Sequence, residues 1–135
     1  MVRSFAVAAS LAVLLLVGWA APVSRASAAA DASNIGFVIY TKGYAPGTLN
    51  ARWIYSGNYS GSGIAVGGPK EGFAGRYHVR YYYDDGRFSD EYDLVISKAG
   101  DVYKASWITS GQVAAVGVGM EVQNGLAVGW RRVAD

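Results

Sequence analysis

The sequence predicts an all-β protein: an eight-stranded antiparallel up-and-down barrel built from two four-stranded repeats. Three observations predict it, namely short runs of β-branched and aromatic residues, turn residues in every gap between them, and an internal repeat. Sliding the sequence on itself by 54 places puts Ala51, Trp53 and Gly63 on Ala105, Trp107 and Gly117. A match at a fixed period is typical of one supersecondary unit made twice. Eight strands close a barrel that either fills with side chains or holds one small ligand.

Residues 1–30 have the three parts of a signal peptide in order. Arg3 gives a basic start, Phe5 to Val17 is almost entirely apolar, and the small residues Ala26 to Ala30 offer a cleavage site. We therefore expect residues 31–135 to form a single β-barrel domain that is secreted or periplasmic, with no membrane span after cleavage.

Cleavage would also change the charge balance. The twelve basic residues lose Arg3 and Arg25, which leaves ten Lys and Arg against ten Asp and Glu. A net charge of zero lacks the cationic excess of a nucleic-acid-binding protein, so no nucleic acid is expected as a partner. The chain has no cysteine, and closure of the sheet and burial of aromatic residues must therefore supply its stability.

The strands follow in order from runs of β-branched and aromatic residues. These runs are Ile35–Lys42, Leu49–Tyr55, Gly61–Val66, Gly75–Tyr83, Tyr92–Ser97, Val102–Thr109, Val113–Val122 and Leu126–Val133. The gaps hold Pro46-Gly47, Gly57-Asn58, Gly67-Gly68-Pro69, Asp85-Gly86, Gly100-Asp101, Gly111-Gln112 and Asn124-Gly125. Connections this short permit tight reversals and leave no room for a crossover helix, so successive strands must be antiparallel.

Alternation along each strand predicts which side chains face the interior. The predicted inward residues are Leu49, Ala51, Trp53, Tyr55, Tyr77, Val79, Tyr81, Tyr83, Tyr103, Ala105, Trp107, Val116, Val118, Met120, Leu126, Val128 and Trp130. On this assignment four strand glycines, Gly61, Gly63, Gly117 and Gly119, face outward. Arg52, Arg80, Lys104 and Arg131 are also placed outside, which disfavours an outer-membrane barrel with its apolar outer band.

The strand count, the meander order and the inward tryptophans resemble those of the calycin group, the lipocalin-like and avidin-like barrels. The resemblance covers residues 31–135 and implies a barrel able to hold a ligand. Segments Gly117 to Val122 and Gly125 to Trp130 are also similar to a group of small exported bacterial proteins of unassigned function.

Few residues suit catalysis or metal binding. His78 is the only histidine, and alternation places it outside between Arg76 and Arg80, so neither a Ser–His–Asp arrangement nor a His-rich zinc site has enough parts. We expect no enzyme, no cofactor and no metal site. The acidic stretch Asp84 to Asp93 is interpreted as a polar hairpin tip, although five acids there leave calcium binding open.

Tyrosine is unusually frequent: residues 31–135 hold ten Tyr against three Phe. A buried tyrosine needs a partner for its hydroxyl, so repeated Tyr indicates a wet or ligand-facing end of the barrel. We expect Tyr55, Tyr81, Tyr83 and Tyr103 to form the contact surface. The predicted function is that of an exported, non-enzymatic, calycin-like binding protein for a small apolar molecule, a sugar or an extracellular protein surface. The alternative is a structural or envelope-associated barrel with a packed core and no ligand.

Overall fold

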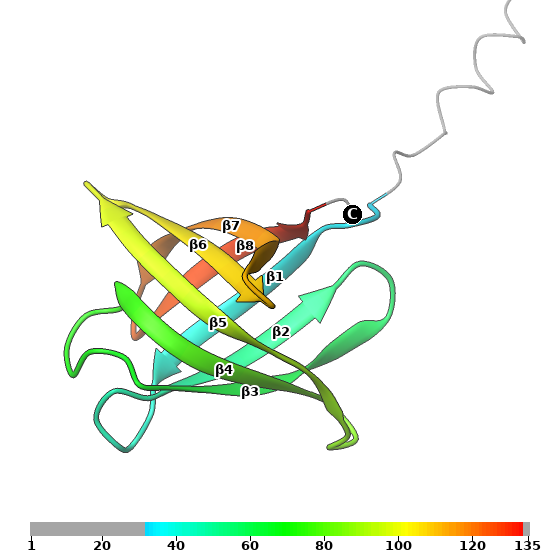
Figure 1. Ribbon diagram of the computed structural model, residues 1–135, viewed down its shortest axis with the longest axis horizontal. Coiled ribbons are helices and arrows are strands. Elements are labelled where there is room, and N and C mark those ends of the chain that lie inside the picture. The colour runs from blue at the N-terminus through cyan, green and yellow to red at the C-terminus, as the bar shows by residue number, and fades with distance from the viewer. Residues whose placement is uncertain (1–31, 134–135) are drawn as a thin grey trace, which may run out of the picture. The chain divides into compact units, whose positions relative to one another are not determined.

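The computed structural model describes residues 32–133, and the predicted signal peptide lies outside them. The strands are β1 (Gly36–Lys42), β2 (Leu49–Tyr55), β3 (Tyr59–Val66), β4 (Gly75–Tyr83), β5 (Phe88–Ala99), β6 (Val102–Thr109), β7 (Gln112–Val122) and β8 (Gly125–Arg132). Each pairs antiparallel with the next, and β8 pairs with β1 to close the barrel (Figure 1). The predicted eight-stranded antiparallel up-and-down barrel is confirmed. Among residues 32–133 no helix is long and apolar enough to span a bilayer.

Tight turns explain the meander. Gly86 in the β4–β5 turn has a φ of 91°, which favours glycine because it lies in the left-handed region. Asn124 in the β7–β8 turn has a φ of 65°, a value that asparagine tolerates better than most residues. These two residues reverse the chain within a few positions, as the sequence predicts.

Most of the predicted inward positions are confirmed. Trp53 and Trp107 keep 8% and 3% of their surface exposed, and the residues two positions before each of them, Ala51 and Ala105, are buried as well. In both cases the alanine pairs with a glycine of the following strand, Gly63 or Gly117 respectively. The barrel interior is therefore built from large rings set beside very small residues.

The prediction for β7 is wrong, because its glycines and not its large side chains face inward. Val118 and Met120 are 57% and 63% exposed. A Cβ on Gly117 would lie 2.8 Å from the side chain of Val128 and 3.2 Å from that of Trp107. Both faces of β7 carry small or apolar residues. Alternation therefore offers no polar side chains to mark which face is exposed, and the sequence pattern assigned the wrong face to the interior.

The glycines of β3 also face inward, because neighbouring rings fill the space beside them. A Cβ on Gly61 would meet the indole of Trp53 at 2.9 Å, and one on Gly63 would meet the ring of Tyr81 at 2.6 Å. The large rings of β2 and β4 occupy the space that side chains at these two positions would need.

The acidic stretch is mostly strand and not hairpin tip. β5 begins at Phe88, four residues before the predicted start at Tyr92, and only residues 84–87 form the turn. Glu91 and Asp93 face outward beside His78 on β4, which lies 3.5 Å and 3.3 Å from their carboxylates. Acidic residues can occupy this strand because they pair with basic side chains on the neighbouring strand.

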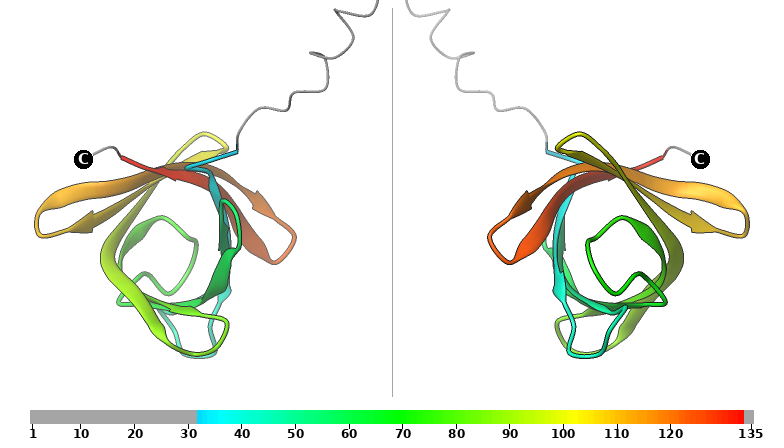
Figure 2. Two further views of the ribbon diagram at one scale, coloured as in Figure 1. Left: turned by 90° about the vertical axis from the view of Figure 1, so that its right-hand side faces the viewer. Right: turned by 90° about the vertical axis from the view of Figure 1, so that its left-hand side faces the viewer.

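The two ends of the barrel differ. At one end the β3–β4 connection brings in Phe73, which is buried, and its carbonyl accepts a 2.9 Å hydrogen bond from the hydroxyl of Tyr77. Figure 2 shows this connection, in green, inside the outline of the ring of strands. Lys42 donates to the carbonyl of Gly72 and lies over the ring of Phe73. We call this the closed end; the β2–β3, β4–β5 and β6–β7 turns surround the other, open end.

Candidate functional site

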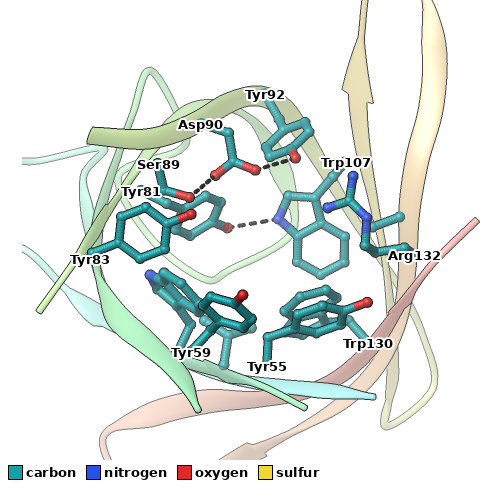
Figure 3. A pocket seen from close by; sticks show the side chains of 13 residues that line it. Tyr55, Tyr59, Tyr81, Tyr83, Ser89, Asp90, Tyr92, Trp107, Trp130 and Arg132 are labelled. Carbon is teal, nitrogen blue, oxygen red and sulfur yellow. Dashed lines mark hydrogen bonds between the residues drawn. The ribbon is translucent and has the colours of Figure 1, made fainter. Parts of the chain in front are cut away.

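A cavity of about 300 Å³ lies inside the barrel at its open end (Figure 3). We call it the aromatic pocket, because eight of its thirteen lining residues are Trp or Tyr. The lining residues are Val38, Trp53, Tyr55, Tyr59, Tyr81, Tyr83, Ser89, Asp90, Tyr92, Trp107, Ala115, Trp130 and Arg132. Every strand of the barrel contributes at least one of them.

Three of the four tyrosines predicted to form a contact surface line this pocket. Tyr55 and Tyr83 are the last residues of β2 and β4, and Tyr81 lies one inward position deeper on β4. Their convergence at one end follows from the antiparallel order, since β2 and β4 both finish there.

Tyr103 lies at the closed end and does not line the pocket. It is the second residue of β6, which starts at the closed end, and it pairs with Lys98 and Gly119. Its hydroxyl donates a hydrogen bond to Glu121. This bond, together with burial, raises the pKa of Tyr103 to about 12. Alternation correctly predicted that Tyr103 points inward, but not the end at which it lies.

The floor of the pocket is a buried hydrogen-bonded group. The indole nitrogen of Trp107 donates to the hydroxyl of Tyr81 at 2.7 Å, and that hydroxyl also shares a 2.5 Å hydrogen bond with the hydroxyl of Tyr40. Burial raises the pKa of both tyrosines well above the ordinary value. The hydroxyls therefore remain neutral at physiological pH. The floor of the pocket thus contains polar groups that are already hydrogen-bonded to one another.

The walls are rings in mutual contact. Tyr55 stacks on Trp130 with centroids 4.8 Å apart and an interplanar angle of 11°. Trp130 lies 6.1 Å from Trp107, and Trp53 lies 6.0 Å from Tyr83. Such contacts hold the rings in place, so the pocket is formed before any ligand enters.

Two charged residues that strand alternation did not place inside the barrel also line the pocket. Asp90 lies on the inner face of β5, where its carboxylate accepts hydrogen bonds from Ser89, at 2.9 Å, and from Tyr92. Arg132 is the last residue of β8. Alternation extended back from Leu94 to Asp90, and forward from Trp130 to Arg132, would have found both. The assignment of Asp90 to a turn hid the first of them.

Burial and the carboxylate of Asp90 raise the pKa of Tyr92 to about 12, and the nearby Arg132 opposes this shift. The Tyr92 hydroxyl therefore stays protonated and keeps donating to Asp90 at neutral pH. Asp90 and Arg132 thus lie on either side of Tyr92 at the rim of the pocket.

His78 lies on the outer wall, away from the aromatic pocket. Its ring is bracketed by Glu91 and Asp93, and Arg76 and Arg80 approach the same two acids at 3.6 Å and 3.5 Å. The structure thus places His78 in an exposed ladder of paired charges. Within residues 32–133, no three side chains of His, Cys, Asp or Glu are grouped so as to hold a metal ion.

No protein-family model, curated protein or solved structure matches the chain. The fold and the site alone define its class: a closed eight-stranded β-barrel with an aromatic pocket at one end.

Proposed function

We propose that the protein is an exported, non-enzymatic binding protein of calycin-like type that holds a small molecule in the aromatic pocket. The cavity of about 300 Å³ carries the proposal. It lies at the lower end of the roughly 300–1,000 Å³ range of small-molecule sites, whereas a barrel with a packed core would have almost no free interior. The cavity therefore favours a ligand-binding barrel over a structural one.

The lining supports the same proposal. Ligand pockets are mostly apolar and carry a few polar groups that orient the ligand. Here Trp and Tyr rings form the walls, while Ser89, Asp90 and Arg132 supply polar groups at the rim. Binding without chemistry is proposed because the sequence has one histidine and no cysteine, and that histidine lies on the outer wall.

Filling the cavity tests the proposal. Ala115 lines the pocket and is 7% exposed, so Ala115→Leu extends a larger side chain into the free space. Ala127→Leu is the matched control, because Ala127 alternates with the buried Leu126 and Val128 and faces outward. Titration of tryptophan fluorescence with small aromatic compounds, apolar compounds and sugars should show binding to the wild type and to Ala127→Leu. Ala115→Leu should lose it.

Two results would contradict this function. One is the absence of binding by any compound to the folded wild type. The other is binding that Ala115→Leu leaves unchanged, since the ligand would then lie elsewhere.

A further inference from the structure

Asp90 is a carboxylate that faces the interior of a barrel. Charged groups are expensive to remove from water unless they are paired, and the inward positions that follow it on β5 hold Tyr92, Leu94 and Ile96. Its hydrogen-bond donors are the neutral hydroxyls of Ser89 and Tyr92. Among the described residues no ion pair includes Asp90. Its negative charge thus lines the pocket with no direct ion pair in residues 32–133, and Arg132 lies across the Tyr92 hydroxyl from it.

Arg132 brings the opposite charge to the same pocket. Its backbone is held at two points by Asn34: the amide of Arg132 donates to Oδ1 at 2.8 Å, and Nδ2 of Asn34 donates to the carbonyl of Arg132 at 3.0 Å. These bonds fix the end of β8, from which the side chain reaches the pocket beside Trp107 in Figure 3. No ion pair joins Arg132 to Asp90.

The space near the two charges is aromatic. Figure 3 shows Tyr92 and Trp107 next to Asp90 and Arg132, with the stacked Tyr55 and Trp130 on the opposite side of the pocket. Ring faces of this kind favour a planar aromatic ligand through stacking. They also strengthen the contact of a nearby organic cation.

We propose that the ligand is a small aromatic zwitterion whose protonated nitrogen binds Asp90 and whose anionic group binds Arg132, with the aromatic ring between the Trp and Tyr side chains. This inference rests on the proposed function and names the ligand class for the same pocket. An amine without an anionic group would face Arg132 as a like charge. An acid without an amine would face Asp90 in the same way. A neutral aromatic compound would leave both charges partly desolvated and unpaired.

A matched series of ligands tests the charge pattern on the wild-type protein. The probes are phenylalanine, which carries both charges, phenethylamine, which carries the positive charge, phenylpropionate, which carries the negative charge, and ethylbenzene, which carries neither. Isothermal titration calorimetry at neutral pH should rank phenylalanine first, about tenfold or more ahead of each of the others, because hydrogen bonds to charged groups exceed neutral ones. Ethylbenzene binding as tightly as phenylalanine would overturn the inference and leave the proposed function standing. Phenethylamine or phenylpropionate binding as tightly as phenylalanine would overturn it in the same way.

Two variants assign the charges to residues. Asp90→Asn should weaken phenylalanine and phenethylamine about tenfold or more and leave ethylbenzene unchanged. Arg132→Gln should weaken the binding of phenylalanine and phenylpropionate about tenfold or more and leave that of ethylbenzene unchanged. Asp93→Asn and Arg131→Gln are the matched controls, since Asp93 is on the outer face of β5 and Arg131 alternates with Trp130 on β8. Equal losses for all four ligands, or control variants that behave like the test variants, would overturn the inference. Failure of all four ligands to bind the wild type would also overturn the inference, and it would count against the proposed function only if the apolar compounds and sugars failed to bind as well.

Discussion

The indole nitrogen of Trp107 on β6 donates a 2.7 Å hydrogen bond to the hydroxyl of Tyr81 on β4, across the interior of the barrel. Both side chains are buried, and the Tyr81 hydroxyl is also hydrogen-bonded to Tyr40 on β1. One hydroxyl thus satisfies groups from two other strands. The bond explains why this inward position holds tyrosine and not phenylalanine.

Tyr81→Phe should therefore lower the free energy of unfolding by about 1–3 kcal/mol, because the indole N–H of Trp107 and the hydroxyl of Tyr40 each lose a partner in a buried place. Tyr83→Phe is the control, as Tyr83 is partly exposed at the open end. Chemical denaturation of both variants measures the difference. Equal stabilities would show that the buried group contributes nothing beyond packing.

Trp53→Ala and Trp107→Ala should each cost about 3–5 kcal/mol of stability, as buried aromatic residues do. The two rings are similarly buried, and each indole nitrogen donates a hydrogen bond, to the carbonyl of Ser62 at 3.0 Å and to Tyr81 respectively. Urea unfolding followed by circular dichroism measures both. A neutral effect at one of them would contradict the equivalent roles that the internal repeat predicts.

Gly61→Ala should be strongly destabilising, by about 2 kcal/mol or more, because overpacking a strand interior forces the backbone apart. The added Cβ would lie 1.8 Å from the backbone oxygen of Tyr82. Gly129→Ala is the matched control: it is also a strand glycine, and an added Cβ meets no atom within 4 Å. Thermal unfolding should separate the two variants clearly. Similar melting temperatures would place Gly61 on the outer face, as the sequence pattern predicted.

Stability should fall at alkaline pH as tyrosines ionise. The pKa values of Tyr92 and Tyr103 are raised from the ordinary 10.0 to about 12. Because the folded-state pKa is above the unfolded value, the contribution of each tyrosine to the free energy of unfolding is fully present below about pH 10. It is lost as the pH rises through about 12. Ultraviolet difference titration of the folded protein should show these tyrosines ionising late. Glu121→Gln should lower the pKa of Tyr103 and leave that of Tyr92 unchanged. Ionisation of all tyrosines near pH 10 would contradict this prediction.

The exported product should begin near Asp31. This expectation comes from the basic start, the apolar run and the small residues Ala26 to Ala30, which lie outside the described residues. Intact-mass spectrometry of the protein recovered from outside the cytoplasm measures the cleavage point. A product that retains Met1 and sediments with membranes would contradict it.

The open-end site could be predicted only in part from the sequence. Surplus tyrosine and strand alternation correctly placed Tyr55, Tyr81 and Tyr83 on inner faces, and the pocket contains all three. The inward position of Asp90 was not predicted, because a run of acidic residues resembles a turn when the neighbouring strand is not known. The cross-strand partners that make β5 a strand there, such as Arg80 beside Glu91, come from β4.

The sequence by itself determined the number and order of the strands and the inward phase of the tryptophans, because turn residues and alternation act over a few positions of the chain. The tertiary structure alone decided three further points. It placed Tyr103 and Tyr83 at opposite ends, turned Gly61 and Gly117 inward, and brought Asp90 and Arg132 to one cavity. Each depends on the stagger of neighbouring strands when the barrel closes and on the large rings competing for the same interior volume. These relations join residues far apart in the chain, and no local pattern encodes them.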